Sequence, residues 1–237
     1  MMKRAIGVVA LSVACGSALG QVPWDASDGP NKIGPSGSGS FFSWANGQSD
    51  NGLFGSPELL NGSTFLFNPI GFTADSQDGS SQTTSDTLRV DLTADAGFFF
   101  SQIRFVQIGS YFVENGAEAS LASTLNVLDN TISPGARSSN ANMVFTPGST
   151  FTSTAGTTNS GVYNGEVLAT LGTQADPWSD VSVEFSADLI TVTTGDGQSS
   201  SLTIGVTGSQ IAIQVIPAPA TAALAGLGLL AGTRRRR

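Results

Sequence analysis

The carboxylates are the side chains of this sequence best suited to chemistry, because the 237-residue chain has no histidine and one cysteine. Cys15 stands inside an apolar N-terminal run, so the rest of the chain cannot form a Ser-His-Asp triad, a Cys-His dyad or the usual His/Cys zinc site. A Ser-Lys mechanism would depend on Lys32, which lies in a Gly/Pro-rich segment where precise positioning is disfavoured. We therefore do not expect an enzyme.

Paired carboxylates remain as an acid–base chemistry that the composition allows. Glycoside hydrolysis needs only two carboxyl groups at the right separation, and Glu114, Glu118, Glu166 and Glu184 are candidates among the 18 acidic residues. Neither their spacing nor their flanking sequence selects a pair. Solvent-facing charges on strand edges and loops are the favoured explanation, so we assign no catalytic residue.

Calcium is the metal that the acidic residues could bind, because it takes six to eight oxygen ligands. Asp75, Asp78 and Asp86 form one group of oxygen donors, although their spacing departs from an EF-hand loop. The segment from Asp25 to Asp28 and the tripeptide around Asp196 are explained equally well as turns. We expect no obligatory cofactor and keep calcium binding as an open alternative.

Three tryptophans could stack on sugar rings, although their ordinary role is burial. Trp44 lies in an aromatic cluster and is expected in the core, and Trp24 follows a proline near the start of the mature chain. Trp178 follows Asp176-Pro177 in an expected loop. Trp178 is therefore the candidate for contact with a ligand.

The charge of the chain is concentrated at its ends. Six of the ten cations lie in the two terminal segments, so the remaining body has four cations against 18 carboxylates, a formal net charge of −14. Such a surface repels phosphate backbones, and we expect no nucleic-acid partner.

The N-terminus has the layout of a secretory signal peptide. Lys3 and Arg4 precede an apolar run over residues 5–14, and Ala18 and Gly20 supply the small residues that a signal peptidase requires. We expect cleavage after Gly20, or alternatively after Ala18. Residues 1–20 are therefore predicted to be a signal helix that is removed.

The C-terminus combines a proline motif, an apolar run and a cationic end. Pro217-Ala218-Pro219 precedes twelve residues, 220–231, that are almost wholly apolar, and the chain ends on Arg234, Arg235, Arg236 and Arg237. As a helix this run would cover about 18 Å, well short of the roughly 30 Å hydrocarbon core. Four arginines resist translocation, so we expect transient membrane insertion with the body outside the cytoplasm.

This tail resembles the PEP-CTERM sorting signal of Gram-negative bacteria, in its Pro-Ala-Pro variant. Ala218 stands where the family usually has glutamate, and the match covers residues 217–237. The resemblance implies recognition by an exosortase, a membrane transpeptidase-like enzyme that cuts near Pro217 to Pro219. It also implies delivery of the body to the cell envelope, cell surface or extracellular matrix. Such tails occur on unrelated bodies, so the resemblance gives an address and not an activity.

The body reads as a series of short strands. Leu88, Val90 and Leu92 alternate with polar residues, which is the period of a strand with one dry face. Similar patterns recur over 41–44, 64–67, 70–72, 121–127, 143–145, 162–171, 181–185, 190–192, 202–206 and 211–215. Gly109 is expected to mark a bulge or a turn between two strands within 98–113. Residues 21–40 carry several prolines and glycines and are expected to be flexible.

These patterns predict an all-β fold. We expect an antiparallel β-sandwich or jelly-roll over residues 41–216, flanked by the signal helix and a short apolar helix. The first hypothesis for its function is a structural or adhesion protein associated with extracellular polysaccharide. The alternatives are a lectin-like carbohydrate-binding module, with or without calcium, and a carboxylate-only glycoside hydrolase.

Overall fold

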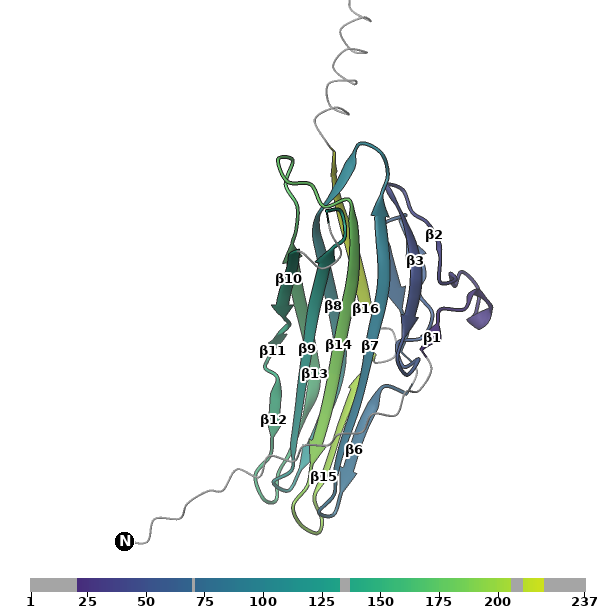
Figure 1. Ribbon diagram of the computed structural model, residues 1–237. Helices are drawn as coiled ribbons and strands as arrows, with labels where there is room; N and C mark the ends of the chain where they lie inside the picture. Colours follow the sequence, from purple (N-terminus) through teal and green to yellow (C-terminus); the bar gives the residue numbers. More distant parts are fainter. Residues whose placement is uncertain (1–20, 70, 133–136, 206–210, 220–237) are drawn as a thin grey trace, which may run out of the picture.

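The computed structural model describes residues 21–69, 71–132, 137–205 and 211–219, which form two antiparallel sheets packed face to face (Figure 1). This confirms the expected all-β sandwich. The signal segment and the chain from residue 220 onward, where the two flanking helices were expected, lie outside the described residues. In the described part, the single helix is the short 3-10 helix η1 (Ala26–Asp28), and no helix has the length and apolarity needed to cross a membrane.

Sheet A has eight strands, with the order β1-β3-β7-β14-β9-β10, in which β2 also pairs with β3 and β12 with β9. Its strands are β1 (Val22–Pro23), β2 (Gly37–Ser38), β3 (Phe42–Ser49), β7 (Ser81–Ala94), β9 (Glu118–Asp129), β10 (Arg137–Asn142), β12 (Thr150–Thr152) and β14 (Asp180–Val192).

Sheet B also has eight strands, with the order β11-β13-β8-β16-β5-β4, in which β15 pairs with both β6 and β8. Its strands are β4 (Glu58–Leu60), β5 (Thr64–Phe67), β6 (Thr73–Gln77), β8 (Phe98–Glu114), β11 (Val144–Thr146), β13 (Thr158–Thr170), β15 (Ser199–Ile204) and β16 (Ile211–Pro219).

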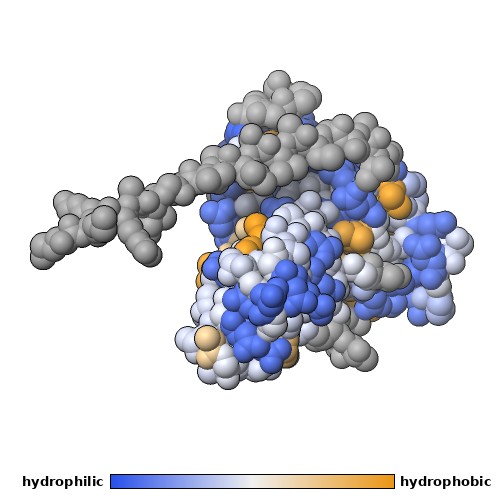
Figure 2. Space-filling view, turned by 90° about the horizontal axis from the view of Figure 1, so that it is seen from below, coloured by the Kyte–Doolittle hydropathy of each residue, from blue (hydrophilic) through white to orange (hydrophobic). Residues whose placement is uncertain are grey.

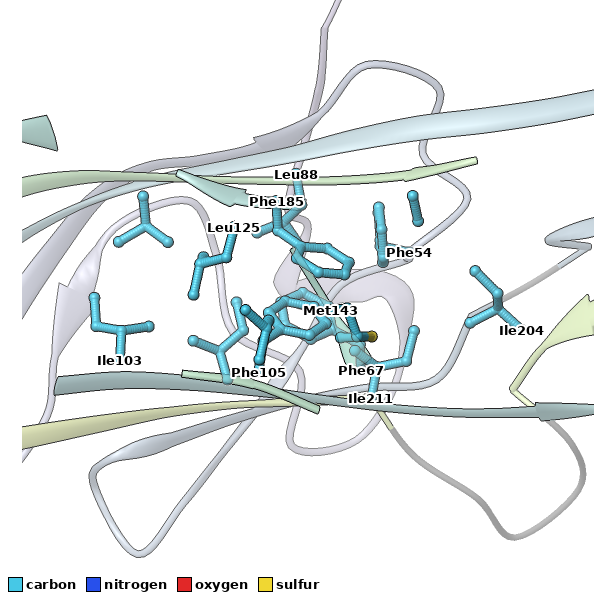
Figure 3. Packing of buried hydrophobic residues seen from close by; sticks show 14 of the residues in the cluster. Phe54, Phe67, Leu88, Ile103, Phe105, Leu125, Met143, Phe185, Ile204 and Ile211 are labelled. Atoms are coloured by element: carbon cyan, nitrogen blue, oxygen red, sulfur yellow. The ribbon is translucent and has the colours of Figure 1, made fainter. Parts of the chain in front are cut away.

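The core lies between the inner faces of the two sheets. The alternating residues of β7 and β14 that point inward are buried, as the period of two requires. Phe185 of sheet A stacks on Phe105 of sheet B with ring centroids 3.5 Å apart, and Phe54 packs against Phe185 from the side (Figure 3). These aromatic contacts join the two sheets. The end of the sandwich that carries the β6–β7 and β14–β15 turns is mainly hydrophilic (Figure 2).

Gly109 does not separate two strands, which corrects the prediction from the sequence. The strand β8 is continuous over 17 residues, and Gly109 lies opposite Tyr163 in it. A Cβ atom at position 109 would lie 2.2 Å from the Tyr163 hydroxyl, so the absence of a side chain makes room for that buried ring. The Tyr163 hydroxyl donates a hydrogen bond to the carbonyl of Thr203 and accepts one from the side-chain amide of Gln107. Close packing, and not a turn, explains the glycine.

Residues 21–40 belong to the sandwich, contrary to the expected flexible segment. Val22 pairs with Ser49, and Trp24 is buried against Phe65 and Phe67, with ring centroids 5.5 and 5.6 Å away. Proline and glycine shorten the ladders here without preventing packing, because a buried tryptophan removes a large apolar area from water. The body therefore begins near Val22 and not at residue 41.

The C-terminal boundary of the body also differs from the predicted one. Residues 217–219 continue β16 in the ladder with β8, so the sheet ends at Pro219 and not at residue 216. Other expected strands are present, such as β5 over Thr64–Phe67, and the segments expected at 181–185 and 190–192 are parts of the single strand β14.

Candidate functional site

A row of polar side chains crosses the outer face of sheet A. Gln48 of β3 lies opposite Arg89 of β7, which lies opposite Glu184 of β14, which lies opposite Asn126 of β9. Residues opposite each other on neighbouring strands share one face, so the four side chains form a line across four strands. Arg89 Nε donates to Glu184 Oε2 at 2.9 Å, and Arg89 also forms an ion pair with Asp50. Arg89 therefore bridges two carboxylates.

A second set of hydrogen bonds lies beside this row. Asp91 accepts from Asn46 Nδ2 at 2.7 Å and from the Ser182 hydroxyl at 2.6 Å. Ser182 accepts in turn from Asn130 Nδ2 at 2.8 Å. We call Asn46, Gln48, Asp50, Arg89, Asp91, Asn126, Ser182 and Glu184 the polar network. Most of it lines a shallow hollow of about 300 Å³ on the sheet surface.

The loop after β3 positions Asp50 for this network. The buried carboxylate of Asp86 accepts backbone N–H groups of Asn51 and Leu53, each at 2.8 Å, and Phe54 anchors the same loop in the core. The sequence indicates a defined loop over 49–57 but assigns it no chemistry. Its role in the structure is to hold a carboxylate beside Arg89.

Arg89 keeps its positive charge between its two carboxylate partners. Burial alone would lower the pKa of Arg89, but the carboxylates of Asp50 and Glu184 outweigh this and raise the pKa, so the guanidinium stays charged. The carboxylates are occupied by a cation, an amide and a hydroxyl. These contacts hold the side chains in place, so their remaining N–H groups and lone pairs form a fixed array for hydrogen bonds to a polar ligand.

Sheet B carries a larger hollow of about 530 Å³ on its own outer face. Its lining includes Val144 and Leu168, which are exposed, and Glu166, whose Oε1 accepts from Arg104 Nε at 2.8 Å. This surface has fewer directed polar groups than the polar network, so it is a weaker candidate for specific recognition of a polar ligand.

Trp178 is buried, whereas the sequence suggests an exposed position in a loop. The side chain is only 7% exposed, and the Arg137 guanidinium lies over its ring, 5.2 Å from the centroid. Arg137 also pairs with Asp129 and Asp176. The Trp178 carbonyl accepts from the Phe100 N–H of β8 at 2.8 Å, which ties the loop to sheet B. Trp24 and Trp44 are buried as well.

The structure distributes the four glutamates over both sheets. Glu184 and Glu166 lie on different sheets, and each pairs with an arginine of its own sheet. Glu114 ends β8 and Glu118 begins β9, so they flank the turn that links the two sheets. Of the four, Glu184 alone belongs to the polar network.

Three of the aspartates considered for calcium form hydrogen bonds within the protein. Asp86 caps the loop after β3, Asp78 accepts from the Gly197 N–H at 2.8 Å, and Asp25 caps η1 by accepting from the Ser27 N–H at 2.8 Å. Among the described residues, no group of three or more Asp, Glu, His or Cys side chains is placed to hold a metal ion.

The predicted sorting residues divide between the two parts of the chain. Pro217, Ala218 and Pro219 lie in β16. Ala18, Gly20 and the four arginines at 234–237 lie outside the described residues.

Comparisons with known proteins define no family for this chain. No family model and no curated protein matches it. Among solved structures, the enzymatically active domain of bacteriophage CBA120 tailspike protein 4 matches at 11% identity with a TM-score of 0.17, covering 74% of this chain and 19% of that one. A structure of the infectious bursal disease virus Gt strain matches at 11% identity with a TM-score of 0.20, covering 68% of this chain and 44% of that one. The chain thus spans less than half of either.

Proposed function

We propose that this chain is a non-enzymatic protein of the cell envelope or extracellular matrix that associates with polysaccharide through the polar network of sheet A. The observation that carries the proposal is the row from Gln48 to Asn126, which presents a guanidinium, a carboxylate and two amides across four strands. Sugar hydroxyls both donate and accept hydrogen bonds, so they suit such an array. A rigid sheet also holds the array without a large entropic cost on binding.

The charge of the body favours a neutral polysaccharide. All four cations of the body, Lys32, Arg89, Arg104 and Arg137, pair with carboxylates. Within the described residues, most of the 18 acidic side chains form no ion pair. An anionic polymer would meet repulsion over most of the surface. Neutral glucans such as dextran avoid this repulsion and can still form the hydrogen bonds.

The export and sorting part of the proposal is supported by the sequence of the two ends. The signal-peptide layout at 1–20 and the Pro-Ala-Pro tail both place the body outside the cytoplasm. Signal peptidase and an exosortase-like membrane enzyme are the processing partners that we propose. The polar network would then face the extracellular polymer.

A matched pair of arginine variants tests the polysaccharide proposal. The chain would be run in native affinity gels that contain dextran, soluble β-glucan or xylan, with alginate as the anionic comparison. Arg89→Gln should weaken binding to a neutral polymer about fivefold or more, because it removes the centre of the network. Arg104→Gln removes an equivalent ion pair on sheet B and should bind like the wild type.

Retardation by none of the polymers, or equal weakening by both variants, would count against the proposal. Binding that is lost on chelation would favour the calcium-assisted lectin instead. Release of reducing sugar by the purified chain, abolished in Glu184→Gln, would favour the glycoside hydrolase.

Mass spectrometry of the chain from an exosortase-bearing host, with and without that enzyme, tests the sorting proposal. We expect a body that starts near Gln21 and ends near Pro217 only where the enzyme is present. An intact arginine end in both strains would leave the tail as a simple anchor.

A further inference from the structure

The Pro-Ala-Pro motif is part of the folded sheet. Pro217, Ala218 and Pro219 form the last part of β16 and lie opposite Phe100, Phe99 and Phe98 of β8, in that order. Figure 1 shows β16 running beside β8 to the upper end of the sandwich. Phe99 and Phe100 are buried, so the strand against which the motif packs is itself fixed in the core. The motif is therefore not on a free linker.

A β-bulge lies at the start of the motif, and a side-chain hydrogen bond from Ser101 spans it. The register shifts between Ile216 and Pro217, which leaves Ser101 of β8 without an opposite residue. The Ser101 hydroxyl donates to the Ile216 carbonyl at 2.8 Å, and the Ser101 carbonyl accepts from Leu171 N–H at 2.9 Å. Ser101 thus fastens the residue immediately before the motif to the neighbouring strands.

We infer that the folded body masks its own sorting motif, so that the motif must separate from β8 before an exosortase can cut it. This inference rests on the proposed function. A transpeptidase binds its substrate as an extended segment and uses the backbone groups of that segment. Cleavage breaks one peptide bond, transfers the acyl group of the body to water or an amine acceptor, and leaves a new amine on the tail. Pairing with β8 covers one edge of residues 217–219, so the backbone groups on that edge are not accessible to the enzyme.

The prolines make the mask weak enough to open. Pro217 and Pro219 have no N–H group, so Ala218 is the only backbone donor of the motif. On its other side β16 pairs with β5 only over residues 211–214. Strand ends with few hydrogen bonds open locally at low cost. Processing of the folded chain is therefore limited by local opening.

Two insertions of the same four residues, Gly-Ser-Gly-Ser, distinguish the effect of masking on the processing rate from the effect of the distance between the motif and the membrane. An insertion between Ile216 and Pro217 moves the motif off β8. An insertion between Pro219 and Ala220 keeps the register and only lengthens the path to the apolar run. In a pulse-chase experiment on the full chain in an exosortase-bearing host, the first insertion should be processed roughly tenfold faster than the wild type. The second should match the wild type. Ser101→Ala should be processed faster by a smaller factor.

The outcomes distinguish the inference from the proposed function. Equal rates for the wild type and the first insertion, or equal acceleration by both insertions, would overturn masking while leaving sorting in place. No enzyme-dependent cleavage of any variant would overturn the sorting proposal itself. Hydrogen exchange of the Ala218 amide in the purified chain gives a readout without the enzyme. We expect slower exchange in the wild type than in the first insertion, and equal exchange would also overturn the inference.

Discussion

Replacement of Asp86 by alanine should destabilise the protein and disturb the polar network together. Asp86 is 2% exposed, and its carboxylate accepts the backbone N–H groups of Asn51, Leu53 and Thr87, each at 2.8 Å. A hydrogen bond to a charged group contributes about 1.5–3 kcal/mol, and an unsatisfied buried donor costs about 1–3 kcal/mol. Burial of the carboxylate offsets part of this stabilisation, and water reaches the exposed residue Asn51. We therefore expect a loss of about 3 kcal/mol for Asp86→Ala.

Urea unfolding followed by tryptophan fluorescence measures this loss, because all three tryptophans are buried. Asp75→Ala removes an exposed carboxylate on β6 and should change the free energy of unfolding by no more than about 0.5 kcal/mol. Asp86→Asn keeps one acceptor oxygen and should fall between the two. Because the same loop carries Asp50, Asp86→Ala should also weaken polysaccharide binding in the folded protein. A loss below about 0.5 kcal/mol for Asp86→Ala would refute the reasoning.

Three further predictions follow from the packing and the charges. Phe185→Ala should cost about 3–5 kcal/mol because its ring is fully buried, whereas Ile190→Ala on the exposed face of the same strand should cost less than about 1 kcal/mol; similar urea midpoints would contradict this. Gly109→Ala should cost about 1–3 kcal/mol, because its Cβ would lie 2.2 Å from atoms of two neighbouring strands. Gly148→Ala, where a Cβ meets open space, should leave the thermal midpoint unchanged. Burial would raise the pKa of Asp129, but hydrogen bonds from threonine and arginine side chains outweigh it and lower the pKa below 3.8. Its stabilisation is therefore present above about pH 4 and lost as the pH falls through the lowered pKa. Unfolding measured from pH 5 downward should show a smaller loss for Asp129→Asn than for the wild type, and parallel curves would disprove the assignment.

The alternating pattern of residues in β7 predicts part of the candidate site. Arg89 and Asp91 are interleaved with Leu88, Val90 and Leu92, so the pattern places both on the wet face of a strand. The sequence does not show that Glu184 and Asp50 come to lie beside Arg89. These partners are 95 and 39 residues away along the chain, and only the pairing of β14 with β7 and the loop after β3 bring them together.

The errors made from the sequence share one physical cause. Gly109 and Trp178 were interpreted from local turn chemistry, which describes what a segment tolerates and not what packs on it. The Tyr163 ring explains the glycine, and Arg137, 41 residues before Trp178, covers the tryptophan. The prolines of residues 21–40 likewise concealed a core residue, Trp24.

The sequence by itself determined the all-β class, the wet and dry faces of the central strands and the acidic charge of the body, because strand periodicity and charge are local properties. It also supplied the sorting hypothesis, which rests on a short contiguous motif. Only the tertiary structure decided which polar side chains meet on sheet A and that Pro217 to Pro219 lie in a strand. Both depend on register between strands distant in sequence, which is set by the packing of the whole core.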